Sequence, residues 1–407
     1  MTALPVCYFP EEAAAACVGL SRLGAGYETL RKSSFAELRT RPAPSRSDEL
    51  WRYTHFDRFD ISSLSNPALL ESRLTLIDGQ SIPDFSGLKF KASPSVDSEF
   101  SEAVSSLAAE DPKREYWRAL QFASATSGFV LEVSPGTERA DWLLLKHSID
   151  AEKAGVSSLG VVRVRKGASL KLFEDLDAEF AGLWLPRVEF VVEDGAQLDY
   201  VCLQRAGSRL NCLGRQRFHL GRDTRVKLTH LFCGGLLSRL DLDCLMRAPG
   251  AEVEMRALYL ASGRQQIDFH PLQAHLAPHC KSHLYYKGVA MGQARSVYYG
   301  NILVAPEAQQ TDAYQANRNL LLSPEARADS IPNLEIGAND VRCSHGSSVG
   351  QLGQDEMFYL LSRGLDPVRA KALLVEGFFE DLLKDIKDPV VHDRLWAVVL
   401  EKLNHAA

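Results

Sequence analysis

Four short segments define a period in this chain: Gly167-Ala-Ser-Leu-Lys-Leu172, Gly195-Ala-Gln-Leu-Asp-Tyr200, Asp223-Thr-Arg-Val-Lys-Leu228 and Gly250-Ala-Glu-Val-Glu-Met255. They begin 28, 28 and 27 residues apart, and the third is the weakest match. A near-constant period of this size indicates stacked structural repeats. Two short strands and two turns use about that many residues, so each period predicts one coil of a parallel β-helix. The Gly-Ala step would turn the chain, and the inward Leu or Val of each coil would stack on the next.

The same pattern of short apolar runs separated by turn residues extends on both sides of the repeats. From Gly128 to about Gly350, short runs of alternating Val, Leu, Phe and Tyr are separated by Gly, Asp and Pro, and no helix of ordinary length fits between them. We therefore predict a mainly β protein with a parallel β-helix (solenoid) core over residues 126–350. A solenoid of this kind has open strand edges, which must be capped or paired.

Helical patterns flank the predicted core, over an N-terminal region at residues 1–125 and a C-terminal domain at 351–407. Residues 10–39 predict a helix, residues 41–45 predict a linker, and Ser47 is predicted to cap a helix that follows it. Residues 60–100 predict loops and short strands, and residues 101–124 predict a further helix. In the C-terminal domain we predict helices at 354–364, 366–386 and 388–404, the second with Asp366 as N-cap and Pro367 at the first position.

Composition and charge exclude several classes of function. The chain has 407 residues, 45% apolar and 24% charged, with a net charge of −6, which does not favour nucleic acid or an anionic membrane surface as a partner. No apolar run approaches the roughly 18 residues of a spanning helix, and no signal peptide is evident, so we expect a cytoplasmic protein. The eight cysteines include no C-x-x-C pair, so neither a zinc ribbon nor a thioredoxin-like motif is supported.

Cys343 and His345 are the candidate metal-binding residues. Leu334 to His345 alternates like a strand with a break at Asn339-Asp340, and we expect this strand to end in Gly346-Ser-Ser-Val-Gly350. Side chains two apart share a face about 7 Å apart, and a thiolate and an imidazole both suit iron. A buried thiol beside a hydrogen-bonded histidine is the alternative. An iron–sulfur cluster usually takes four protein ligands, so a cluster here would need ligands from a second chain.

Three other sequence patterns suggest alternative functions. Gly346-Ser-Ser-Val-Gly350 matches the G-x-S-x-G nucleophile elbow, with His392 downstream, but a serine hydrolase of that type needs helices between its strands. His270, His275, His279, Cys280 and His283 could form a metal ladder, although Pro271 and Pro278 interrupt it. A β-helix polysaccharide lyase would have a signal peptide and stacked acidic ligands. No P-loop occurs, so we expect no nucleotide hydrolysis.

Several segments together resemble one known family, the SufB/SufD proteins of the Suf iron–sulfur cluster assembly system. They are Leu334-Glu-Ile, Asp340-Val-Arg-Cys-Ser-His-Gly, Val349-Gly-Gln-Leu, Phe358-Tyr-Leu, Ser362-Arg-Gly-Leu and Glu376-Gly-Phe. The Cys-Ser-His-Gly motif and the modest length favour the SufD branch, with a SufB-type paralogue as the alternative.

The resemblance implies a non-enzymatic scaffold that pairs with SufB and binds the SufC ATPase. It implies that Cys343 and His345 take part in nascent cluster formation at the SufB interface, with no stably bound cofactor and only a transient iron–sulfur cluster shared with SufB. It also implies that SufC docks on the C-terminal helices, for which we expect Tyr359, Arg363, Glu376 and Phe378 to be contacts. In isolation, the open strand edge could pair two copies as a homodimer.

Overall fold

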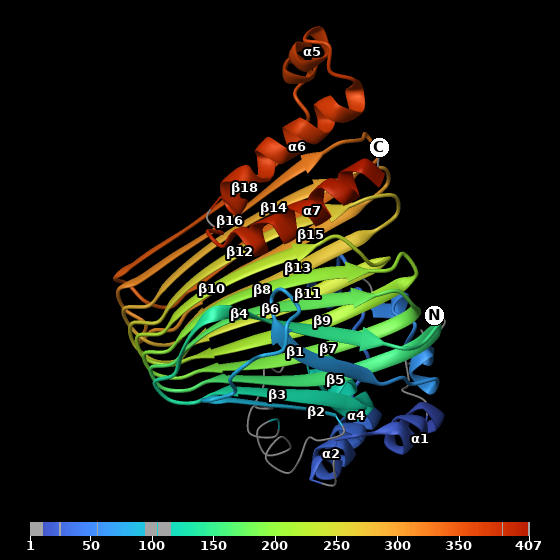
Figure 1. The fold of residues 1–407 in the computed structure, drawn as a ribbon, viewed down its shortest axis with the longest axis vertical. Coiled ribbons are helices and arrows are strands. Elements are labelled where there is room, and N and C mark those ends of the chain that lie inside the picture. The colour runs from blue at the N-terminus through green and yellow to red at the C-terminus, as the bar shows by residue number, and fades with distance from the viewer. Residues whose placement is uncertain are drawn as a thin grey trace.

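The computed structural model describes residues 11–23, 26–54, 56–93, 104, 115–384 and 386–405. It shows two stacked β-sheets, drawn as a long coil in Figure 1, with helices attached at both ends of the chain. Successive strands from β3 onward alternate between the two sheets, and apart from β1 and β2 the neighbours within a sheet run parallel. The predicted parallel β-helix is therefore confirmed.

Each sheet contains nine strands. Sheet I has, in spatial order, β1 (Leu70–Leu76), β4 (Glu138–Ile149), β6 (Ser169–Ala178), β8 (Gln197–Ala206), β10 (Arg225–Phe232), β12 (Glu252–Ala261), β14 (Lys281–Ala290), β16 (Thr311–Leu321) and β18 (Val341–Gln351). Sheet II has β17 (Arg327–Ile336), β15 (Arg295–Val304), β13 (Gln266–His275), β11 (Leu237–Met246), β9 (Leu210–Leu220), β7 (Ala181–Val192), β5 (Lys153–Val164), β3 (Ser127–Val133) and β2 (Leu88–Ala92).

The sequence repeat corresponds to one turn of the coil. Gly167, Gly195 and Gly250 have φ angles of 65°, 70° and 78°, and Asp223 adopts 52° at the equivalent position. Glycine enters this left-handed region without a steric penalty, and aspartate is one of the few other residues that visit it routinely. The backbone N–H of each turn residue donates to a carbonyl in the turn of the next coil, as from Gly167 to Asp194 and from Gly195 to Arg222.

The core lies between the two sheets. Leu170, Leu198, Val226 and Val253 pair in register on β6, β8, β10 and β12, and each is at most 2% exposed. These are the apolar positions predicted from the repeat. Burying one such side chain contributes roughly 1.5–3 kcal/mol, so a continuous column over many coils stabilises the stack against slippage.

The N-terminal region packs against the outer face of sheet II and also extends both sheets. It contains α1 (Glu11–Leu20), α2 (Tyr27–Thr40), α4 (Glu115–Ser124) and the short 3₁₀ helices η1 (Glu49–Trp51), η2 (Phe56–Arg58) and η3 (Ile61–Ser65). The single helix predicted over 10–39 is wrong, because the chain forms two helices, and Gly26 is the N-cap residue of the second. The predicted cap at Ser47 is also wrong, since η1 begins after Asp48. Apart from Val104, residues 101–114 of the helix predicted over 101–124 lie outside the described residues.

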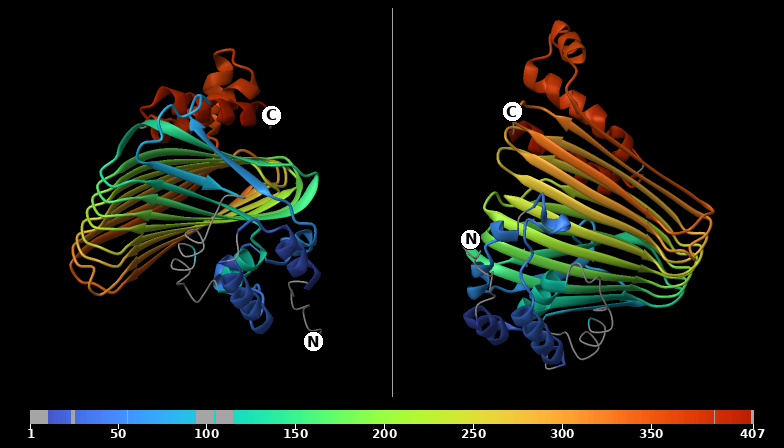
Figure 2. Two further views of the ribbon diagram at one scale, coloured as in Figure 1. Left: turned by 60° about the horizontal axis from the view of Figure 1, so that its bottom comes forward. Right: turned by 180° about the vertical axis from the view of Figure 1, so that it is seen from behind.

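The C-terminal helices are α5 (Gln354–Ser362), α6 (Pro367–Leu383) and α7 (Pro389–His405), close to the predicted bounds. Asp366 caps α6 by accepting hydrogen bonds from the backbone N–H groups of Val368 and Arg369. Helices α6 and α7 cover the outer face of sheet I, on the opposite side from the N-terminal helices (Figure 2), whereas α5 projects away from the sheets (Figure 1). Among the described residues, no helix is long and apolar enough to cross a membrane.

Candidate functional site at the open end of the solenoid

The two ends of the solenoid differ. At one end β1 and β2 pair antiparallel with β4 and β3, which ends the parallel coil. At the other end β17 and β18 are the edge strands of sheets II and I, each with one strand neighbour. Neither β17 nor β18 contains a fully buried residue. Edge strands present unpaired backbone N–H and C=O groups that can pair with another chain.

Cys343 and His345 lie on β18, opposite Ala313 and Gln315 of β16. Ala313 and Gln315 are buried in the coil interior, so by the in-register pairing Cys343 and His345 face the same interior at its open end. Cys343 is half-buried and packs against the last apolar cluster of the coil, while His345 is exposed. The structure therefore brings both predicted residues together on one face.

The thiol of Cys343 is held in its protonated form. Burial and, to a lesser degree, the nearby carboxylate of Asp312 raise the pKa of the Cys343 thiol, and a hydrogen bond from the backbone of Ala313 opposes this. Because the thiolate is the form that binds metal, a metal ion could bind this thiol only with release of its proton.

The local secondary structure corrects two expectations. Leu334 and Ile336 lie on β17 and Cys343 on β18, so the predicted interrupted strand is two strands in different sheets. The strand does not end at Gly346, because β18 continues to Gln351. A nucleophile elbow requires a sharp strand-to-helix turn, and Gly346 to Gly350 lies within an extended strand, so the serine hydrolase alternative is wrong.

The described part of one chain supplies too few ligands for a cluster. In the part of the chain that the structure describes, no group of three or more His, Cys, Asp or Glu residues could hold a metal ion. The four candidate histidines occupy different elements: His270 and His275 lie on β13, His279 in a turn, and His283 on β14. The metal ladder considered for them is therefore wrong.

Each of the three strand histidines has a local partner. His270 is 2.8 Å from Asp268, His275 is 2.8 Å from the Ser282 hydroxyl, and His283 stacks on Tyr314.

The four residues expected to contact a partner lie on α5, α6 and the turn between them. Tyr359 is 56% exposed, and the guanidinium carbon of Arg363 lies over its ring, 5.2 Å from the centroid. Glu376 forms an ion pair with Arg369. Phe378 is half-buried, because its carbonyl accepts a hydrogen bond from Lys287 of β14 and its ring lies beneath the Lys287 ammonium. The neighbouring Phe379 is fully buried against sheet I.

Sequence reasoning missed two features of this structure. The first is the exposed apolar surface of α5 and α6, which includes Phe358, 74% exposed, and the less exposed Leu361, Val368 and Leu373. Spacing alone does not separate it from a core-facing stripe. The second is a buried polar chain inside the coil, in which His147 contacts Glu174, Tyr200 donates to Glu174, and Gln216 links Tyr200 to His230. These residues come from strands far apart in sequence, so no local motif shows them.

Fold and site together define a β-solenoid whose distinctive surfaces are an open strand edge and an apolar helical projection, both suited to other protein chains. Residues 147–378, more than half of the chain, match the family model described as SUF system FeS cluster assembly, SufBD core domain. The chain belongs to this family.

Curated relatives agree with this assignment. An iron–sulfur cluster assembly SufBD family protein of Mycobacterium tuberculosis is 30% identical over 293 residues, covering 70% of this chain and 73% of that protein. A SufBD family protein of Mycobacterium leprae is 34% identical over 236 residues, which is 56% of this chain and 60% of that protein. The iron–sulfur cluster assembly protein SufD of Escherichia coli is 24% identical over 388 residues, covering 88% of this chain and 89% of that protein.

Proposed function

We propose that this chain is a scaffold subunit of iron–sulfur cluster assembly that completes its site by pairing its open end with a second SufBD-family chain. One observation carries the proposal: the unpaired edge of β18 bears a cysteine and a histidine that face the open interior, and the described residues offer no further ligands beside them. An iron–sulfur cluster usually takes four protein ligands, so two equivalent contributions across an interface would meet that need.

The open end is suited to strand addition. Strands β17 and β18 are ten and eleven residues long, and both are available as edges. Strand addition satisfies backbone groups along the whole edge, while alternate side chains provide specificity. Ile336 and Val349 are 43% and 46% exposed, and both face the interior side of the last coil, where a partner coil would bury them.

The partner at this edge is a SufB-type chain in our proposal, and this chain takes the SufD position. The Cys-Ser-His-Gly sequence at 343–346 supports the SufD assignment over the SufB alternative. A homodimer would use the same edge in the absence of that partner. The cluster is cargo passed on from the interface, not a resident cofactor, and the complex would work in the cytoplasm.

The helical projection supplies the second docking surface. Helix α5 and the start of α6 expose Phe358, Tyr359, Leu361 and Val368, an apolar group on a part of the chain that extends away from the solenoid. An exposed patch of this kind marks an interaction site. The sequence has no P-loop, so we assign ATP hydrolysis to the partner that docks here, a SufC-type ATPase.

Co-expression with a SufB-type chain and a SufC-type ATPase tests the proposal. Native mass spectrometry should detect a complex of all three, and iron and sulfide reconstitution should give cluster absorbance that the separated subunits do not give. The proposal is wrong if this chain remains monomeric beside both partners, or if purified chain alone hydrolyses ATP.

A further inference from the structure

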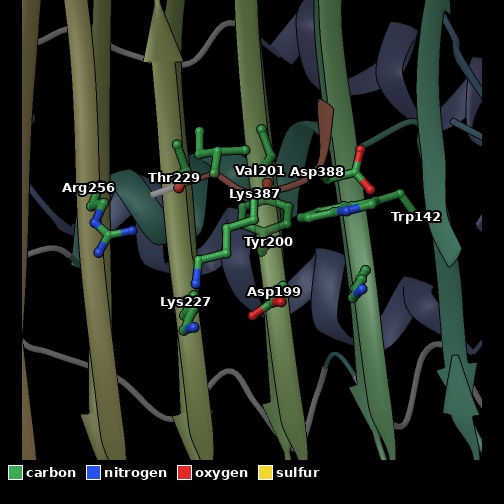
Figure 3. Close-up of a pocket in the computed structure, with 11 residues that line it drawn as sticks. Trp142, Asp199, Tyr200, Val201, Lys227, Thr229, Arg256, Lys387 and Asp388 are labelled. Carbon is green, nitrogen blue, oxygen red and sulfur yellow. The ribbon is translucent and has the colours of Figure 1, made fainter. Parts of the chain in front are cut away.

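A second site lies on the outer face of sheet I, far along the coil from the open end. There a cavity of about 250 Å³ is bounded by neighbouring strands and by the connection between α6 and α7. Figure 3 shows its side chains: Lys227 and Asp199 rise from adjacent strands, Lys387 extends over them from the helix connection, and the indole of Trp142 forms one wall.

The cavity concentrates positive charge in a protein whose net charge is −6. Four basic side chains line it, from Lys171, Lys227, Arg256 and Lys387, against the two carboxylates of Asp199 and Asp388. Lys171, Asp199 and Lys227 are register partners on β6, β8 and β10, so the two lysines flank one carboxylate.

Neither carboxylate balances this charge. The Asp388 side chain accepts hydrogen bonds from the backbone N–H groups of Val390 and Val391 and so caps α7. Asp199 is shared between two lysines, and burial raises the pKa of its carboxyl. Within the described ranges, Lys171, Lys227 and Lys387 form no ion pair within 4.0 Å, whereas Arg256 is paired with Glu254 at 3.1 Å.

This arrangement favours an anion as occupant. Like charges converging on one cavity repel one another, and the repulsion is larger where side chains are partly removed from water. A multivalent oxyanion would relieve it and accept several charge-assisted hydrogen bonds at once. The start of α7 also lies here, and its helix dipole adds positive potential.

We propose that this cavity binds the phosphate groups of a small phosphorylated molecule. Bound phosphate would join the coil strands to Lys387, and so fix the α6–α7 connection against the solenoid. Because α6 leads back to the exposed α5, occupancy of the cavity would stabilise the orientation of the helical projection. This inference does not depend on the cluster site or on edge pairing.

Isothermal titration calorimetry of the full chain with inorganic pyrophosphate tests the proposal. We expect saturable binding at one site per chain that weakens as salt is raised. Lys171→Gln and Lys227→Gln should each weaken it on the order of tenfold, because each removes a charged hydrogen-bond donor. Asp199→Asn should tighten binding, since it removes the one carboxylate between the lysines. Lys281→Gln is the matched control, as Lys281 lies on β14 of the same sheet and pairs with Glu252.

Two results would overturn the proposal: no saturable binding by the wild-type chain, or equal affinities of wild type, Lys171→Gln and Lys227→Gln. Circular dichroism melting of each variant shows that the fold is retained, and hydrogen exchange at 386–388, slowed by pyrophosphate, gives a readout that needs no variant. An ADP titration distinguishes a nucleotide from phosphate groups alone as the occupant of the cavity. Tighter binding than pyrophosphate assigns the cavity to a nucleotide, with Trp142 as the base-stacking wall, and equal binding assigns it to phosphate groups alone.

Discussion

Lys287 of β14 places its ammonium 2.6 Å from a carboxylate oxygen of Asp381 on α6, and thereby joins the C-terminal helices to the outer face of the solenoid. The Lys287 side chain is 6% exposed and also donates to the carbonyl of Phe378 at 2.6 Å. This polar anchor lies within a largely apolar helix–sheet contact, and the Tyr285 hydroxyl also donates to Asp381.

Lys287→Met should lower the free energy of unfolding by about 1–2 kcal/mol, because it leaves the Asp381 carboxylate and the Phe378 carbonyl without their shared donor. Chemical denaturation followed by circular dichroism measures the change. Limited proteolysis should then cut α6 faster. Lys384→Met removes an exposed lysine at the end of the same helix and should leave both measurements unchanged; an equal loss in both variants would show that the anchor contributes nothing.

Among the cysteines that the structure describes, Cys343 should be the most readily alkylated in the folded chain. Among the described cysteines, Cys343 is half-buried and the other six are buried. Because burial raises the pKa of its thiol, the rate with iodoacetamide should rise as the pH increases beyond the ordinary value of 9.0. Peptide mass spectrometry locates the label. Pairing with a SufB-type chain should protect Cys343, and unchanged labelling in the assembled complex would place the interface elsewhere.

Cys343→Ser and His345→Ala should each reduce cluster formation in the reconstituted complex while changing the free energy of unfolding by less than about 1 kcal/mol. Both side chains lie at the edge of the coil, and neither holds the interior together. Cluster absorbance and bound iron measure the effect. Ser344→Ala, on the opposite face of the same strand, is the matched control. Full cluster yield in both site variants would remove them from the site.

Ile336→Lys and Val349→Lys should block assembly with the SufB-type chain and leave the monomer folded. A charge on the inner face of an edge strand opposes pairing, because the partner coil would have to bury it without compensation. Light scattering after size-exclusion chromatography measures the mass. Val368→Lys places the same charge on α6, at a residue 45% exposed, and should still pair. Retained pairing in both edge variants would contradict strand addition at this end.

Acidification should destabilise the chain through its buried histidines. Burial lowers the pKa of His230 to about 3 and that of His275 to about 4, from 6.5. Below pH 6.5 the unfolded chain therefore binds protons that the folded chain does not. The free energy of unfolding should fall by roughly 1.4 kcal/mol per pH unit for each histidine, until the pH reaches the folded pKa.

Urea unfolding between pH 7 and pH 5 measures this dependence. Carboxylates also contribute to it, so the comparison with His230→Gln isolates one histidine. The variant should show a shallower pH dependence, whatever its absolute stability. Identical slopes would mean that folding does not lower the pKa of His230.

The coil could be predicted from sequence because its inward positions repeat. Leu170, Leu198 and Val226 recur at nearly constant spacing, and their column forms the interior. Beyond Gly250 the repeat is no longer recognisable in the sequence, although the coil continues. The turn positions there are His279 and Gln310, with φ angles of 62° and 58°. Their left-handed conformation is maintained by backbone hydrogen bonds from one turn to the next, which residue identity does not reveal.

The candidate site could be predicted only in part. Alternation correctly placed Cys343 and His345 on one face, because that depends on the local strand geometry. The length of β18 could not be predicted, since glycine and serine at 346–350 have low strand propensity and an edge strand gains little from packing. The proposed phosphate cavity combines strand residues between Trp142 and Arg256 with the helix connection at 386–388. These segments lie far apart along the chain, so no local sequence pattern indicates that they come together.

The difference between the two ends of the solenoid limits how far assembly can proceed. Strands β1 and β2 have seven and five residues and run against the coil direction, so they offer poor templates for further addition. Two molecules that meet through their long edges therefore occupy the open parallel edges that the described part of each chain presents. Such a contact closes on itself and yields a discrete particle, where a solenoid open at both ends would propagate into fibrils.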